Sequence, residues 1–286
     1  MTAGASATDE FATEWNVYEP HRVGLPPLRA YLRQLWRRRE FATELARANL
    51  RAQHFNTTLG QLWLILNPLL LAAVYFALVQ IVGGGNRGSE FFAHLMLGLF
   101  AFRLVSTSVS EGARSVVSGG RLILNVAFPR TLLPLASVLT AFMRFLPTLA
   151  VYAVMHGIAG LPVGAHLLWA LPILALLVVF GTGAAMFAAA AQVYFRDLTN
   201  FLPYFTRVWL YMSPVLYYAE EVPDRFRPIL AANPLYPLLG GLSDVVNRGE
   251  GLSLQYLAAG AAWAIGVFLA GTLFFISRER EFAVRL

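Results

Sequence analysis

Residues 167–191 read LLWALPILALLVVFGTGAAMFAAAA, and this stretch contains no charged side chain. About 20 apolar residues are enough for an α-helix to cross the hydrocarbon core of a bilayer, because each residue adds about 1.5 Å of length. The stretch therefore predicts a transmembrane helix and places the chain among helical membrane proteins.

Similar apolar blocks recur on both sides of this stretch. The chain as a whole is 57% hydrophobic and 13% charged, whereas about one quarter of the residues of a soluble domain are charged. The sequence thus predicts an all-α polytopic membrane protein with a six-span transmembrane domain over 61–286. The other five predicted spans are 61–82, 91–109, 132–155, 201–218 and 254–276.

Two of these blocks carry small residues at four-residue spacing, Gly181 with Ala185 and Gly266 with Ala270. Such residues let two membrane helices approach closely. They predict tight packing and say nothing about a substrate.

Three arginines, Arg103, Arg144 and Arg207, fall inside predicted spans. Each would cost roughly 2.5 to 3.5 kcal/mol at the centre of a span, so each must face protein, water or lipid headgroups. Guanidinium groups suit phosphate. For Arg103 and Arg144 we nevertheless favour a structural or interface role over phosphate binding.

All 22 basic residues are arginine, and the chain has no cysteine. A P-loop needs a lysine to reach the β- and γ-phosphates, so this chain cannot hydrolyse ATP by that route. Schiff-base chemistry needs a lysine and thiolate chemistry needs a cysteine, so both are excluded as well. The five histidines lack metal-ligand spacing, so the sequence predicts no metal site. It also predicts no catalytic residue.

The arginines also predict an orientation. Of the 22, 15 fall on the side of the spans that includes both chain ends, four on the other side and three within spans. The positive-inside rule therefore places both termini in the cytoplasm. Because about 60 polar, arginine-rich residues precede the first apolar block, we expect no cleavable signal peptide.

The N-terminal region divides into two parts. Residues 1–25 lack periodicity and predict a flexible cytoplasmic tail. In 26–60, Leu28, Leu32 and Leu35 alternate at helical spacing with arginines, which predicts an amphipathic helix on the inner leaflet followed by a second helix over 41–55. A short soluble helix before the membrane is the alternative.

Two loops also predict short helices. The inner loop 111–130 carries glycines around 118–125 and predicts a short helix that projects toward a cytoplasmic partner. The outer region 219–253 mixes charges, prolines and the apolar stretch 235–242, and predicts short re-entrant helices between the fifth and sixth spans.

Aromatic residues concentrate around the first and fifth predicted spans. Interfacial belts explain many of them. The alternative is a path that offers flat apolar faces with polar tips to a sugar chain. The candidate path residues are Trp63, Tyr75, Tyr204, Trp209, Tyr211 and Tyr217.

Several short motifs follow one another through most of the chain. They are 50–63 with Asn67-Pro68, Phe128-Pro129-Arg130 with Leu133-Pro134-Leu135-Ala136, Tyr194-Phe195-Arg196-Asp197-Leu198, Ser213-Pro214-Val215 with Tyr217, Asn233-Pro234-Leu235, and Phe282-Ala283. In order and spacing they resemble the permease subunits of ABC exporters for polysaccharides and polyol phosphates, the Wzm-like and teichoic-acid-export group. The lysine-free composition is most similar to that of the galactan-export permeases of mycobacteria.

This resemblance implies a homodimer of permease subunits in the bacterial inner membrane, paired with two copies of a separate ATPase subunit. ATP and Mg²⁺ would bind to that ATPase, and this chain would bind no cofactor. The implied substrate is a lipid-linked glycan, and the outer re-entrant helices would close its channel. The implied ATPase interface comprises Arg33, Arg37, Arg47, Arg51, Ser118, Arg121, Leu122 and Asn125, although members of the group often carry a basic residue where this chain has Asn125.

Other functions remain open from the sequence. A related permease could export a drug or a lipid, and the chain could instead be a membrane-embedded glycosyl- or acyltransferase or a scaffold. Enzymes that act on lipid-linked sugars often use a DxD motif, which is absent here, and Glu220-Glu221 is more typical of a solvated loop. Nothing in the sequence suggests a nucleic-acid partner.

Overall fold

The computed structural model describes residues 25–53, 59–83 and 87–285, and within these ranges the regular structure is helical throughout. The predicted tail over 1–25 lies almost entirely outside the described residues. Five helices are long and apolar enough to cross a membrane in the described part of the chain. They are α3 (Trp63–Gly83), α4 (Ser89–Ser118), α6 (Leu132–Ile158), α7 (Ala170–Tyr194) and α11 (Leu254–Arg278).

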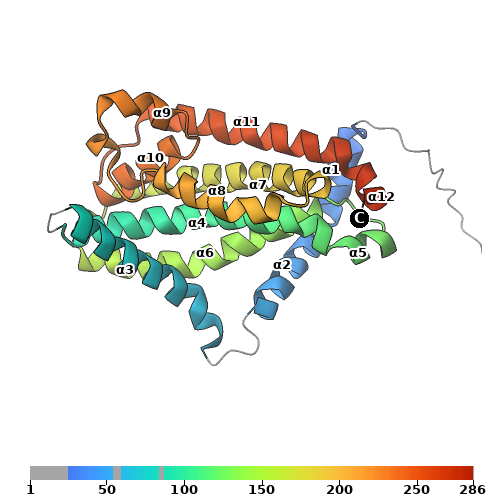
Figure 1. The fold of residues 1–286 in the computed structure, drawn as a ribbon, viewed down its shortest axis with the longest axis horizontal. Coiled ribbons are helices and arrows are strands. Elements are labelled where there is room, and N and C mark those ends of the chain that lie inside the picture. Colours follow the sequence, from blue (N-terminus) through green and yellow to red (C-terminus); the bar gives the residue numbers. More distant parts are fainter. Residues whose placement is uncertain (1–24, 54–58, 84–86, 286) are drawn as a thin grey trace, which may run out of the picture.

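These helices are not equally buried. α4 and α7 run side by side through the centre of the bundle, where α6 and α11 flank them (Figure 1). Most of the apolar surface of α4 and α7 is covered. α3 leans away at the margin and keeps most of its apolar surface exposed. The all-helical membrane class predicted from the sequence is thus confirmed.

Small residues bring α7 against its two neighbours. A Cβ atom on Gly271 of α11 would lie 2.0 Å from the carbonyl oxygen of Gly183, and one on Gly112 of α4 would lie 2.6 Å from the Cβ of Ala185. Neither distance is possible for a larger residue without moving a helix. Close packing was predicted, and Ala185 takes part in it, but Gly266 has no heavy atom within 4 Å of its Cβ position.

The fifth predicted span, 201–218, forms a shorter helix. α8 (Leu198–Tyr211) has 14 residues and measures about 21 Å, which is less than the ~30 Å hydrocarbon core. Pro214 follows soon after, and proline disfavours helical geometry in the residue before it. The helical stretch therefore ends before the apolar stretch does.

Short helices follow α8, as predicted for 219–253. Two 3₁₀ turns, α9 (Arg227–Ala231) and α10 (Tyr236–Asn247) make up this region, and the axes of Asp224–Ala231 and Tyr236–Asn247 differ by 110°. α10 is largely buried against α4, α7 and α11. If the bent pair counts as one span, the described chain has up to six.

One side chain joins α8 to the bent pair. The amide nitrogen of Asn233 donates to the Met212 carbonyl and to Ser213 Oγ, both at 3.0 Å. Its oxygen accepts from Trp209 Nε1 at 2.8 Å and from the backbone of Leu235 at 3.0 Å. Asn233 is buried, so these bonds satisfy polar groups that water cannot reach.

The opposite end of the bundle gathers α1 (Leu28–Arg37), α5 (Gly120–Asn125) and α12 (Phe282–Arg285) (Figure 1). α2 (Arg39–Gln53) packs along α6. The predicted amphipathic segment begins with the helix α1, whose Leu28, Leu32 and Trp36 remain exposed on one side, and its place on the inner leaflet stays a prediction. The predicted loop over 111–130 begins later than expected, because α4 continues through Glu111 and ends only before Gly119.

Candidate functional site

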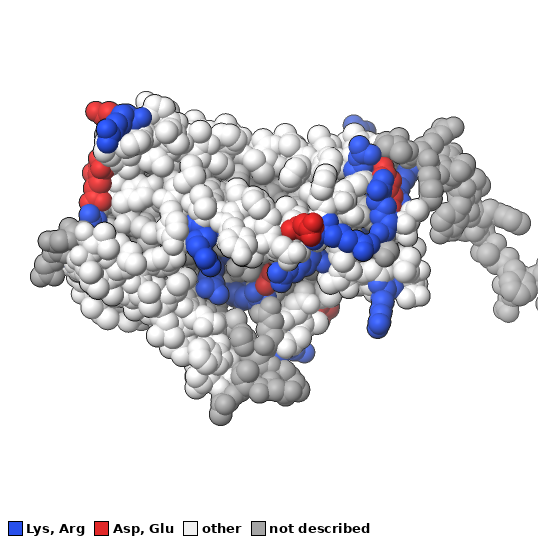
Figure 2. All heavy atoms as spheres, in the orientation of Figure 1, with Lys and Arg blue, Asp and Glu red and all other residues white. Residues whose placement is uncertain are grey.

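A polar groove opens between α3, α4, α6 and α8. Its volume is about 530 Å³, and its lining includes the basic residues Arg103, Arg114, Arg144 and Arg207 and a single acidic residue, Glu111. Ser106, Thr107, Ser110 and Thr206 add hydroxyl groups. Figure 2 shows basic side chains crossing the middle of an otherwise mostly uncharged face. A cationic groove thus lies at mid-length on the apolar bundle.

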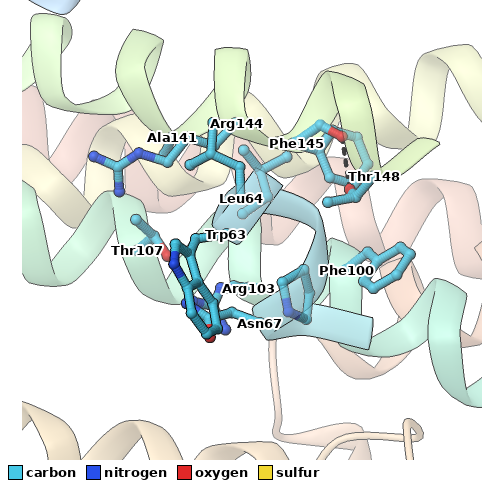
Figure 3. Close-up of a pocket in the computed structure, with 12 residues that line it drawn as sticks. Trp63, Leu64, Asn67, Phe100, Arg103, Thr107, Ala141, Arg144, Phe145 and Thr148 are labelled. Carbon is cyan, nitrogen blue, oxygen red and sulfur yellow. Dashed lines mark hydrogen bonds between the residues drawn. The ribbon is translucent and has the colours of Figure 1, made fainter. Parts of the chain in front are cut away.

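A smaller cavity of about 230 Å³ adjoins the groove and shares Arg103, Thr107 and Arg144 with it. In Figure 3, Trp63 and Asn67 of α3 lie beside Arg103 of α4. α6 supplies Arg144 and Thr148 from the other wall. Three long helices therefore place polar groups around one cavity.

Arg144 has one partner in this cavity. Its Nη1 donates to Glu111 Oε1 at 2.5 Å, and the two side chains are 17% and 30% exposed. The Nε and Nη2 atoms of Arg144 are buried and have no hydrogen-bond partner within the described chain. The ion pair therefore uses only one nitrogen of the guanidinium group.

Arg103 lies near the middle of α4 on an exposed side of the helix. Contact with lipid chains there would cost roughly 2.5 to 3.5 kcal/mol. The face of α4 that carries Arg103 must therefore meet water or another protein surface. The expectation that the arginines within spans avoid lipid accordingly depends on what covers this groove.

Apart from Trp209, the candidate path residues fall in four places. Trp63 lines the smaller cavity, Tyr75 lines the groove next to Arg207 and Tyr211, and Tyr204 is 69% exposed on α8. Tyr211 and Tyr217 line a further pocket of about 330 Å³ between α8 and α9.

Trp209 points away from the groove. It packs against the rings of Phe102, Phe180 and Phe205 and donates to Asn233. Its neighbours give it a structural role between α8 and the bent pair, whereas Tyr75 and Tyr211 lie where a path could pass.

The predicted ATPase interface lies at the end of the bundle formed by α1, α2 and α5. Of its eight residues, Leu122 is half-buried and seven are exposed: Arg33, Arg37, Arg47, Arg51, Ser118, Arg121 and Asn125. Ile123 anchors α5 in a cluster that includes Phe275 and Phe282. α5 therefore belongs to the same apolar cluster as the C-terminal end of α11 and α12.

A junction of buried polar groups lies at this end, and the sequence did not predict it. Glu279, which is 9% exposed, accepts from the Tyr31 hydroxyl at 2.5 Å and from the backbone nitrogen of Arg130 at 2.5 Å. Arg130 Nη1 also donates to the Glu279 carbonyl, and Tyr31 contacts Thr131. Burial, followed by the charge of Glu279, raises the pKa of Tyr31. The phenol thus keeps its proton and ties α1 to α6 and α11.

Ion pairs join the loops at the end of the bundle opposite α1. Arg87 pairs with Glu221 at 3.0 Å, and Arg248 pairs with Glu220. The hydrogen bond from Arg248 holds the pKa of Glu220 below its ordinary value. The acidic pair considered in the sequence is therefore engaged in joining loops.

The sequence model of the ABC-2 type transporter family matches residues 41–246. The chain belongs to this family. The match covers α2 through most of α10, which includes every helix that lines the groove. The groove thus lies within the matched part of the chain.

Named relatives of this ABC-2 type protein agree with the match. Two O-antigen export system permease proteins RfbA of Klebsiella pneumoniae are each 26% identical to the chain, over 73% and 79% of its length and 81% and 88% of theirs. A protein of the same name from Myxococcus xanthus is 29% identical over 88% of this chain and 97% of that protein. The resemblance to permease subunits of polysaccharide ABC exporters is confirmed, and these relatives are transport subunits.

Proposed function

We propose that the chain is the permease subunit of an ABC exporter that moves a lipid-linked polysaccharide, a galactan, across the bacterial cytoplasmic membrane. The observation that carries the proposal is the groove that holds exposed Arg103 at mid-span, beside Tyr75 and Tyr211. Arginine and tyrosine offer cationic, aromatic and hydroxyl contacts, which suit a phosphorylated glycan. The relatives named as O-antigen export permeases support the same class of cargo.

The energy for export would come from a separate ATPase. The chain has no lysine, so it cannot supply a P-loop of its own. Two copies of the ATPase, carrying ATP and Mg²⁺, would dock on α1, α2 and α5, and Arg33, Arg37 and Arg121 would form part of the contact. Closure of the ATPase dimer would then move these helices as rigid bodies and open the path.

A homodimer would complete the groove. α3 keeps Leu70, Val74 and Leu78 exposed and lies beside the groove. A second copy packed near this face would cover apolar surface and shield the arginines from lipid. The path would then run between the two copies.

Depletion of the chain in a producing cell tests the function. If the chain is a permease, lipid-linked galactan of full length should accumulate at the inner leaflet and disappear from the cell surface, and the wild-type gene should reverse both effects. A glycosyltransferase would instead leave shortened or missing glycan. Unchanged surface galactan, or loss of drug or lipid export alone, would refute the proposed cargo.

The absence of cysteine allows a clean test of orientation. Ser118→Cys at the predicted cytoplasmic end and Glu250→Cys at the outer end would each provide a unique thiol. With both termini inside, a membrane-impermeant maleimide should label intact spheroplasts of Glu250→Cys and label Ser118→Cys only after lysis. The reverse pattern would contradict the proposed topology.

A further inference from the structure

The two arginines of the small cavity have binding capacity that the chain leaves unused. Arg144 gives only Nη1 to Glu111, while its buried Nε and Nη2 find no acceptor in the described residues. Buried donors in native proteins are nearly always satisfied, and an unsatisfied one points to an unseen water, ion or ligand. The unused guanidinium edge therefore calls for an acceptor.

Charge in the cavity is also unbalanced. Arg144 pairs with Glu111, which is the single acidic residue lining the adjoining groove, whereas Arg103, Arg114 and Arg207 add three further positive charges without a second acid. Uncompensated charge is costly inside a membrane protein, because the surroundings screen it poorly. An anion that entered from the groove would remove this imbalance.

The other polar groups of the cavity favour an oxyanion. Asn67 and Thr107 present an amide and a hydroxyl, and Trp63 brings an indole N–H, so donors outnumber acceptors. Thr148 already gives its hydroxyl to the Phe145 carbonyl and adds nothing. Arginine forks bind phosphoryl oxygens in a bidentate manner, which gives such a site both strength and geometry.

We propose that Arg103 and Arg144 bind the phosphoryl oxyanion of a lipid phosphate ester in this cavity, in place of the structural or interface role that the sequence alone favours. The inference rests on the proposed function to the extent that the lipid carries a glycan. The same chemistry could come from the phosphodiester that joins the glycan to its lipid, or from a bulk phospholipid headgroup. Either ligand would use the guanidinium edge that Glu111 leaves free, and its attached group would extend into the larger groove.

A binding measurement on the permease–ATPase complex in zwitterionic nanodiscs tests the site. Two probes, a radiolabelled polyisoprenyl diphosphate and phosphatidylglycerol, distinguish the two sources, and inorganic diphosphate serves as a soluble competitor. We expect at least one lipid probe to bind and to be displaced by diphosphate. Binding of the isoprenyl probe alone assigns the site to the carrier lipid, and binding of phosphatidylglycerol alone assigns it to the headgroup.

Matched variants then locate the binding. Arg103→Gln should weaken binding of the probe at least tenfold. Arg225→Gln, in the outer region, should change that binding less than twofold. Arg144→Gln alone would leave Glu111 without its partner and could unfold the chain. It is therefore combined with Glu111→Gln, which keeps the net charge of the pair. The double variant should also bind the probe at least tenfold more weakly. Undiminished binding in both variants, with folded protein, would overturn the site.

Glycan export is measured separately on the same variants. Loss of probe binding together with unchanged export would refute the site as part of the path while leaving the proposed function intact. Arginine-dependent probe binding by a wild-type complex that exports no glycan would refute the proposed function and leave the site standing. The two claims can therefore fail independently.

Discussion

The hydroxyl of Tyr31 donates to Glu279 Oε2 at 2.5 Å, although the two residues are 248 positions apart. The bond joins α1, on the predicted ATPase side, to the end of α11. Backbone and side-chain groups of Arg130 complete the junction, which also includes the start of α6. Movement of α1 would thus reach two long helices through one buried carboxylate.

Tyr31→Phe should destabilise the protein by about 1 to 3 kcal/mol, because it removes a donor from a buried carboxylate. Thermal unfolding in detergent, followed by tryptophan fluorescence, measures the change. Tyr204→Phe is the control, since Tyr204 is exposed and its hydroxyl has no partner in the described residues. Equal stability of the two variants would show that the junction contributes nothing to the fold.

Trp209→Phe should cost about 1 kcal/mol by removing the indole bond to Asn233 while keeping most of the aromatic packing. Trp209 faces away from the groove, so glycan export by the folded variant should fall less than twofold. A large loss of export with unchanged stability would place Trp209 in the path after all.

Tyr75→Leu and Tyr211→Leu should instead reduce glycan export severalfold with little effect on stability, because both residues lie along the groove and its outer continuation. ATP-dependent export by reconstituted complexes provides the measurement. Drug or lipid export by a related permease would not require these aromatic faces. Full glycan export by both variants would count against a path on this side of α8.

Acid should weaken the outer loop junction. The pKa of Glu220 is held below its ordinary value by Arg248, so Glu220 binds protons less readily in the folded protein than in the unfolded chain. Its contribution is therefore present above its ordinary pKa of about 4.3 and disappears as the pH falls through the lowered value. The pair is exposed, so the effect should stay below about 1 kcal/mol.

Glu220→Gln compared with wild type measures that contribution. The melting temperatures should differ slightly at pH 7 and converge near pH 3. A difference that grows as the solution becomes acidic would contradict the assigned sign.

Charge reversal of Arg33 and Arg121 should weaken docking of the ATPase at least tenfold, because both side chains are exposed at the same end of the bundle. Copurification with the tagged ATPase provides the measurement, and Arg225→Glu at the opposite end is the control. Equal loss in all three variants would indicate a general folding defect rather than an interface.

The long spans and the amphipathic α1 could be predicted from the sequence, because apolar runs and helical periodicity are local signals. The end of α8 was harder to place. Hydropathy continues beyond Tyr211, whereas Pro214 and the bonds of Asn233 favour a turn there. Pro214 is a local signal for this end, but Asn233, which binds Ser213, lies 20 residues after it in the sequence.

The partners of the buried charges could not be found in the same way. Glu111 was placed in an inner loop because charges end an apolar window, yet α4 continues through Gly112 as far as Ser118 and brings Glu111 to Arg144. Glu279 stands among other charged residues in 278–281, so its local sequence gives no sign of its burial. Pairings across 33 and 248 positions depend on how helices pack, which local patterns do not encode.

Reconstitution tests the central claim most directly. Proteoliposomes that contain this chain, its ATPase and a lipid-linked galactan are treated with a membrane-impermeant glycosidase, before and after ATP is added to the side of the ATPase. The account predicts that protected galactan becomes digestible only when both proteins and ATP are present, and that an ATPase lacking its P-loop lysine abolishes the change. Galactan that stays protected, or sugar transfer by this chain alone, would contradict it.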